Sequence, residues 1–281
     1  MQDSFSYCEQ LVREADKDRF LASLFAPADR RPRLMALYAF NVEIARVREH
    51  IHEALAGEVR LQWWRDALKD PPPDEARANP VADALIDTIV RCRLPAESLL
   101  RLIDAHTFDL YDDLMPSQIE LETYARRTSS ALIELAAAIL GGSEIDLGET
   151  AIHAGEAYAI TGLLRALPLH AARGQVYIPR DVLDRHGVSR EEIVAGRATD
   201  ALKAVLAEMR QQVRQHLAEL DEWRSLVPPE VSPAFLPVAL VPALLTRMER
   251  RDYDPFKLLE LSQWRRQWIL WRAARRDFPG G

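Results

Sequence analysis

The sequence predicts an all-α fold, and three observations support this prediction. Through most of the chain, apolar side chains recur at intervals of three and four residues instead of alternating, which is the spacing of one helix face. Three prolines at 71–73, two glycines at 141–142 and a short extended stretch from Gly174 to Pro179 divide this pattern into segments of helical length. The chain contains no glycine-rich phosphate-binding loop, which disfavours Rossmann and P-loop folds. We therefore expect one domain, residues 1–281, in which a helical bundle surrounds a central cavity.

The first strong apolar stripe begins just after Pro32 and includes Leu34, Leu37 and Tyr38. Proline suits the first turn of a helix because its missing amide donor is not needed there. The pattern predicts a helix over 33–52, preceded by one over 5–26. The remaining expected helices span 58–69, 80–92, 96–110, 118–140, 147–167, 199–225, 233–248 and 255–276.

Composition excludes several classes of function. A chain of 281 residues with 48% hydrophobic content can bury a substantial core, and its net charge of −7 argues against a general nucleic-acid binder. Cys8 and Cys92 lie in no metal-binding pattern, so we expect neither a disulfide framework nor a structural zinc site, and a reducing cytoplasm is the expected compartment. No signal-peptide pattern and no uninterrupted apolar run of about 18 residues occurs. The prediction is a soluble protein, or a peripheral one on the inner face of a membrane.

Three parts of the chain carry a resemblance to a known family. They are Asp18 to Phe20 with Pro32 to Phe40, Leu121 to Tyr124 with Ser129 to Ala131, and Leu163 to Arg165 with Ala172 to Pro179. Their order and spacing resemble squalene/phytoene synthases, in which a Tyr-Ala-Phe helix leads into a first aspartate-rich motif, a central helix lines the prenyl tunnel, and a second motif follows. This resemblance implies the isoprenoid synthase fold, a helical bundle around a cavity.

The same resemblance implies a chemistry for which this sequence lacks the residues. Ionising a prenyl diphosphate requires magnesium, and the family binds it with two Asp-x-x-x-Asp pairs whose carboxylates share one helix face. Ala45 and Glu49 match the first pair, and Ala166 and His170 match the second. Since one carboxylate of the four remains, we expect no catalytic residues and no metal site at these positions. Pro168 should also end or kink its helix.

Other family positions are retained. Arg165, Arg173 and Tyr177 match residues near the second motif. Tyr38 belongs to the Tyr-Ala-Phe segment, and Asn41 follows it directly. We take these five as candidate ligand-binding residues, for an anion or for a prenyl or other lipid-like molecule.

The loss of aspartates is similar to that in the family branch that contains the mitochondrial complex I assembly factors and their bacterial relatives. The segment from Gly57 to Asp66 looks like a signature of that branch. This resemblance implies a non-catalytic assembly or lipid-binding helper for a respiratory membrane complex, with a subunit of that complex as partner and no cofactor. The alternative is a prenyl transferase of isoprenoid biosynthesis with an altered metal site, which would need magnesium.

Several other residues allow two interpretations. Asp109 and Asp113 repeat the Asp-x-x-x-Asp spacing, but a lone acidic pair lacks opposing ligands, so a solvated helix end is expected in preference to a relocated magnesium site. His170 has no assignable carboxylate or histidine beside it, so ordinary packing or exposure is expected. Trp63 and Trp64 belong either to a core helix with an internal arginine–aspartate ion pair or to a partner-binding face.

A second tryptophan cluster lies near the C-terminus. Trp264, Trp268 and Trp271 follow i, i+4, i+7 spacing and form one stripe on a helix that also carries several arginines. The tryptophans either pack onto the bundle, with the arginines at its rim, or lie in a bilayer interface with the arginines drawn to anionic lipid. The second interpretation predicts peripheral membrane contact.

Overall fold

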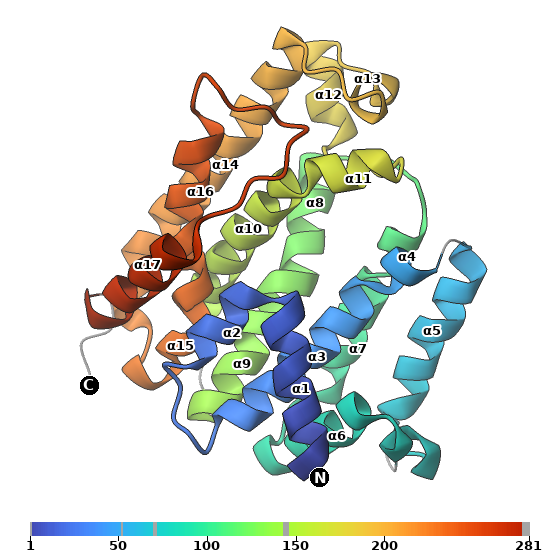
Figure 1. The fold of residues 1–281 in the computed structure, drawn as a ribbon, viewed down its shortest axis with the longest axis vertical. Coiled ribbons are helices and arrows are strands. Elements are labelled where there is room, and N and C mark those ends of the chain that lie inside the picture. Colours follow the sequence, from blue (N-terminus) through green and yellow to red (C-terminus); the bar gives the residue numbers. More distant parts are fainter. Residues whose placement is uncertain (1, 52, 70–71, 143–145, 277–281) are drawn as a thin grey trace.

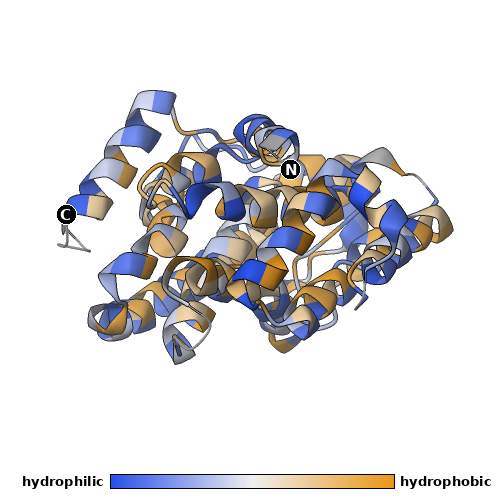
Figure 2. Ribbon diagram, turned by 90° about the horizontal axis from the view of Figure 1, so that it is seen from below, coloured by the Kyte–Doolittle hydropathy of each residue, from blue (hydrophilic) through white to orange (hydrophobic). Residues whose placement is uncertain are grey.

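The computed structural model describes residues 2–51, 53–69, 72–142 and 146–276, and these ranges contain helices and loops but no strand. The helices pack around one large cluster of buried apolar side chains. Most helices carry both hydrophobic and hydrophilic residues (Figure 2), as expected for amphipathic helices that pack on one face. The all-α prediction is confirmed.

Two of the expected N-terminal helices are each divided in the structure. Asp16 separates the first two helices because its side chain accepts a hydrogen bond from the Arg19 amide at 3.0 Å and so caps the second. Arg46, with φ of −101° and ψ of 9°, separates the next two. The helices are α1 (Gln2–Ala15), α2 (Lys17–Ser23), α3 (Arg31–Ala45), α4 (Val47–His50) and α5 (Ala54–Ala67).

The next expected helices agree closely with the structure, and one has an unexpected feature. The expected helix over 118–140 contains a π-helical turn, η3, at Arg126–Ser130. Such turns are rare and occur often at functional sites. The helices of this region are α6 (Pro80–Cys92), α7 (Ala96–Ala105), α8 (Gln118–Ala125) and α9 (Ala131–Gly141).

The long helix α10 (Gly148–Arg165) runs through the middle of the bundle and packs against α14 (Asp200–Trp223), α9 and η3 (Figure 1). Pro168 lies in the first turn of a new helix, α11 (Leu167–Ala172), so the predicted break is confirmed. Two short helices, α12 (Arg180–His186) and α13 (Arg190–Val194), were not expected from the sequence.

The C-terminal region departs most from the prediction. Prolines divide the expected helix over 233–248 into α15 (Ser232–Phe235), the 3₁₀ segment η6 (Leu236–Leu240) and α16 (Val241–Met248). The final helix, α17 (Gln263–Arg276), begins later than expected, after a turn in which the Asp254 side chain accepts from the Phe256 amide at 3.0 Å.

One segment, Pro229–Met248, has the length and mean apolar composition of a membrane span, although Glu230 and Arg247 interrupt its apolar run. Most of it is buried inside the bundle, as the core helix of a soluble protein would be, so it is weak evidence for a span.

Candidate functional site

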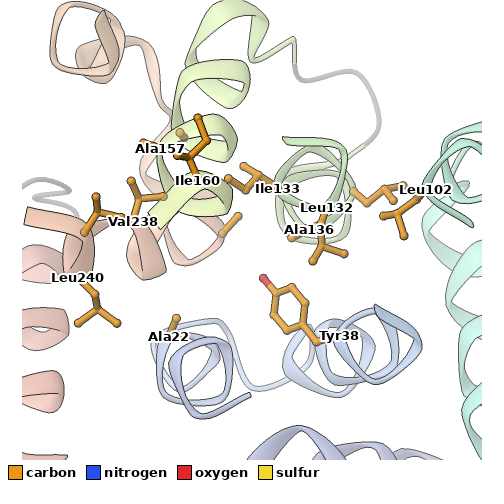
Figure 3. Close-up of a cluster of buried hydrophobic side chains, with 14 of the residues drawn as sticks. Ala22, Tyr38, Leu102, Leu132, Ile133, Ala136, Ala157, Ile160, Val238 and Leu240 are labelled. Atoms are coloured by element: carbon orange, nitrogen blue, oxygen red, sulfur yellow. The ribbon is translucent and has the colours of Figure 1, made fainter. Parts of the chain in front are cut away.

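A cavity of about 490 Å³ lies between α2, α10, α16, α17 and the loop that precedes α17. Among the described residues, none of those that line it comes from α3, the first part of the expected 33–52 helix. Helix α3 is instead packed into the apolar core, where the side chain of Tyr38 is only 3% exposed. Figure 3 shows Tyr38 among buried apolar side chains that include Ala136 and Ile160.

The cavity wall contains an ion-pair cluster centred on Asp18 of α2. Its Oδ1 lies 2.5 Å from Nε of Arg266 on α17, and its Oδ2 lies 3.3 Å from Nη1 of Arg165 on α10. Nearby, Asp16 pairs with Arg19 at 2.7 Å. Arginine therefore neutralises each carboxylate that α2 brings to the cavity, whereas magnesium requires carboxylates that are free to coordinate.

The four positions expected to match the family's aspartates contribute one carboxylate in the described structure. Ala45 is exposed at the end of α3, and Ala166 lines the cavity without offering a ligand atom. Glu49 is the one carboxylate of the set, and it lies 2.6 Å from Arg46 and 3.5 Å from Arg173. This ion pair joins α4 to the chain that follows α11, so the two motif regions do converge.

His170, the fourth of these positions, packs against the ring of Tyr177 with 4.6 Å between centroids. Burial lowers its pKa to about 4, against the opposing effect of the nearby Asp109 charge. His170 is therefore neutral at pH 7, consistent with the ordinary packing expected for it.

Asp109 is buried, and the expectation of a solvated helix end is wrong for it. Its carboxylate accepts hydrogen bonds from Tyr124 at 3.0 Å and from Tyr177 at 2.7 Å, and lies 2.6 Å from Nδ1 of His106. Tyr177 is 68 residues away in the chain, so sequence spacing did not indicate this burial. The expectation holds for Asp113, which is exposed.

The five candidate ligand-binding residues are not brought together. Only Arg165 lines the cavity. Tyr38 is buried in the core, Asn41 is half-buried, Arg173 is exposed, and Tyr177 is buried against Asp109. Sequence reasoning missed the contribution of α2, whose Asp-Arg-Phe segment served only as part of the resemblance.

The tryptophan pair of α5 is mainly structural. Trp64 is fully buried and Trp63 is half-buried against the same core, which favours the core-helix interpretation and removes Trp64 from any partner-binding face. The expected internal ion pair is wrong, because Arg65 pairs with Asp104 of α7 at 2.7 Å and Asp66 pairs with a lysine one turn later.

The C-terminal tryptophans lie on the outer face of α17. Trp264, Trp268 and Trp271 are 84%, 54% and 46% exposed. The side of the helix that packs on the bundle carries Arg266 and Leu270 instead. The interpretation in which the tryptophans pack onto the bundle is therefore wrong.

Comparison with known proteins matches the amino-acid sequence to one family. The squalene/phytoene synthase family profile matches residues 12–272. The chain belongs to the squalene/phytoene synthase family. Within it, the chain is similar to NADH dehydrogenase (ubiquinone) complex I, assembly factor 6, of Rattus norvegicus, at 36% identity over 95% of this chain and 82% of that protein.

Solved structures in the same family have the same fold. Squalene synthase HpnC from Alicyclobacillus acidocaldarius superposes with a TM-score of 0.76 at 26% identity, over 90% of this chain and 96% of that one. A dehydrosqualene synthase in complex with a ligand gives 0.84 at 19% identity, over 96% and 95% of the two chains. The isoprenoid synthase fold and the family predicted from the sequence are confirmed.

Proposed function

We propose that this protein is a non-catalytic member of its family that helps to assemble a respiratory membrane complex of the complex I type. The observation that carries the proposal is the cluster in which Asp18 is held between Arg165 and Arg266. Asp16 and Asp18, the aspartates of the cavity wall, are already paired with arginine and so are not free to bind magnesium diphosphate. Alanine at positions 45 and 166 and the arginine-paired Glu49 support the same conclusion.

The assembly role rests on the name of the relatives that match nearly the whole chain. Complex I assembly factors of Rattus norvegicus and Homo sapiens are 36% and 33% identical to it. The test is to remove the gene from its host and to measure complex I by native gel electrophoresis and by NADH:ubiquinone activity. Loss of assembled complex, restored by the intact gene, is expected; unchanged complex I would refute the role.

The non-catalytic part of the proposal is tested separately. The purified protein is incubated with magnesium and either farnesyl or geranylgeranyl diphosphate, and pyrophosphate release is followed beside an authentic squalene synthase. No release above buffer is expected. Turnover that requires magnesium would instead support the prenyl transferase with an altered metal site.

The cavity is the expected site for a lipid-like ligand. Val241, Leu244 and Leu259 form an apolar part of its wall, and the arginines around Asp18 lie beside them. Its volume falls within the usual range of about 300–1,000 Å³ for small-molecule sites. A filled cavity would show as co-purifying lipid in mass spectrometry of the untreated protein, and replacement of Leu244 by Trp should remove that lipid.

We also propose that α17 contacts a membrane through its outer face. Trp264, Trp268 and Trp271 are exposed there, with the guanidinium of Arg272 5.2 Å from the ring of Trp268 and that of Arg275 4.3 Å from the ring of Trp271. Exposed indole rings and arginines on one helix suit the headgroup region of an anionic bilayer.

Substitution tests this contact better than truncation, because removal of α17 would also remove the Arg266 partner of the buried Asp18. Changing the three outer tryptophans to alanine should weaken binding to vesicles that contain phosphatidylserine at least tenfold. Trp223→Ala, at a 40% exposed tryptophan of α14, is the matched control and should bind normally. Equal binding by all variants would exclude α17 as the contact.

A further inference from the structure

A second cluster of titratable side chains lies outside the cavity, where the first half of α10 packs against α14. His153 and Glu156 come from α10, and His216 comes from α14. The side chain of Glu156 is fully buried, while those of His216 and His153 are 11% and 18% exposed. The cluster is therefore almost enclosed, with its more open side at His153.

The three ligand atoms of this cluster face one another at the separations of a tetrahedral metal site. Nδ1 of His153 lies 3.2 Å from Nδ1 of His216, and Oε2 of Glu156 lies 3.0 Å from His216 Nδ1 and 3.7 Å from His153 Nδ1. A point about 1.9 Å from all three atoms exists in their plane. An ion slightly above that plane would have the zinc–ligand distances of about 2.0–2.2 Å found in proteins.

Hydrogen bonding alone cannot satisfy these three atoms. The carboxylate oxygen is an acceptor, and each imidazole nitrogen is either a donor or an acceptor. If both Nδ1 atoms carried protons, two donors would face each other at 3.2 Å. If only one Nδ1 atom carries a proton, that proton faces two acceptors, the other Nδ1 atom and the carboxylate oxygen. A cation placed between the three atoms would instead accept a lone pair from each of them.

Surrounding side chains hold the cluster in a form that can bind a cation. Nε of Arg126, in the π-helical turn η3, lies 2.5 Å from Oε1 of Glu156, so Oε2 is left to face the histidines. Oε2 of Glu149 lies 3.7 Å from Nε2 of His153. In metal sites, a carboxylate near the second ring nitrogen commonly orients the histidine that binds the metal.

From this geometry we propose that His153, Glu156 and His216 bind a divalent transition-metal ion, with zinc as the best fit. Two imidazoles and one carboxylate are a ligand set of zinc and non-haem iron(II) sites, whereas magnesium prefers oxygen ligands. Three protein ligands leave a fourth position for solvent. The site is distinct from the family's aspartate positions and independent of the assembly role.

The experiment uses the full-length chain without a histidine tag, freed of metal by a chelator and then titrated with Zn²⁺ in competition with a chromogenic chelator. One equivalent is expected to bind. Co²⁺ in place of Zn²⁺ should give the visible absorption of a tetrahedral cobalt centre. His153→Ala and Glu156→Gln should each weaken binding at least 100-fold.

The matched control is His186→Ala, which removes a histidine paired with Glu208 at 2.7 Å near the surface of α12 and α14. It should bind Zn²⁺ like the parent. Since His153 is partly exposed, its alanine variant is the one expected to fold normally, and a thermal melt checks this. Absence of stoichiometric binding, or equal affinity in the parent and in folded His153→Ala, would mean that the cluster only shares a proton, and would overturn the proposal.

Discussion

The two halves of α10 each present a buried or half-buried polar cluster. The clusters differ in the basic side chains that face the carboxylate. In the first half, Glu156 faces His153 and His216, whose nitrogen lone pairs can bind a metal. In the second half, Arg165 joins Arg266 around Asp18. Arginine remains charged at any pH that the protein experiences and offers no lone pair for coordination.

This difference shows why counting carboxylates does not identify a metal site. Both clusters hold one buried carboxylate close to two basic side chains, yet only in the histidine cluster do the basic atoms carry lone pairs, and its three ligand atoms lie within 3.7 Å of one another. The arginine cluster instead connects α2, α10 and α17 and closes one wall of the cavity. The predictions below test this contrast, beginning with the largest expected effect.

Asp18→Asn should destabilise the protein by about 3–5 kcal/mol, because it leaves the charge of Arg266 buried without a partner. Arg165 is 34% exposed and can turn towards solvent, so most of the effect comes from Arg266. Urea unfolding gives the measurement. Asp200→Asn, which breaks an exposed pair with Lys203, is the control and should unfold like the parent. A loss no larger than that of the control would show that the cluster does not hold the three helices together.

The pH dependence at His170 is the second prediction. Its folded-state pKa of about 4 lies below the usual value near 6.5, so between these values the unfolded chain binds a proton that the folded chain does not. Stability should therefore fall by up to about 3 kcal/mol as the pH is lowered from 7 to 4. His170→Gln should remove this part of the dependence, as measured by urea unfolding at a series of pH values. His186→Ala should retain it; an identical slope in His170→Gln would contradict the assignment.

Much of the helical framework was predictable from the sequence, because it depends on local signals. Helix α6 has the bounds that were predicted, and Pro168 ends α10 as expected. The clusters on α10 were not predicted, because their partners lie far apart in the chain: Asp18 is 147 residues from Arg165, and His153 is 63 from His216. The local pattern His153-x-x-Glu156 was a usable signal, since this spacing places both ligands on one helix face.

Gly155→Ala tests how closely α10 approaches the π-helical turn. A β-carbon at this position would overlap the backbone of Ser130 in η3, so one of the two segments must move. We expect a loss of about 1–3 kcal/mol, typical of overpacking in a core. Because Ser130 donates a hydrogen bond to the Ile152 carbonyl at 3.0 Å, the same shift would disturb the first half of α10. An unchanged melting temperature would show that the two segments can separate without cost.

Gly162→Ala is the matched substitution in the second half of the same helix, and it should have the smallest effect and the opposite sign. No neighbouring atom lies within 4 Å of the β-carbon that the change would add, and the position lies inside α10. Alanine is favoured over glycine in a helix interior by about 0.5–1 kcal/mol, so the variant should be more stable than the parent by that amount.

The added methyl group faces the cavity that Gly162 lines, so it should also reduce the amount of any co-purifying lipid. Differential scanning calorimetry of lipid-free protein separates the two effects. A loss of stability in that preparation would mean that the second half of α10 is packed as tightly as the first, and the contrast between the two halves would then fail.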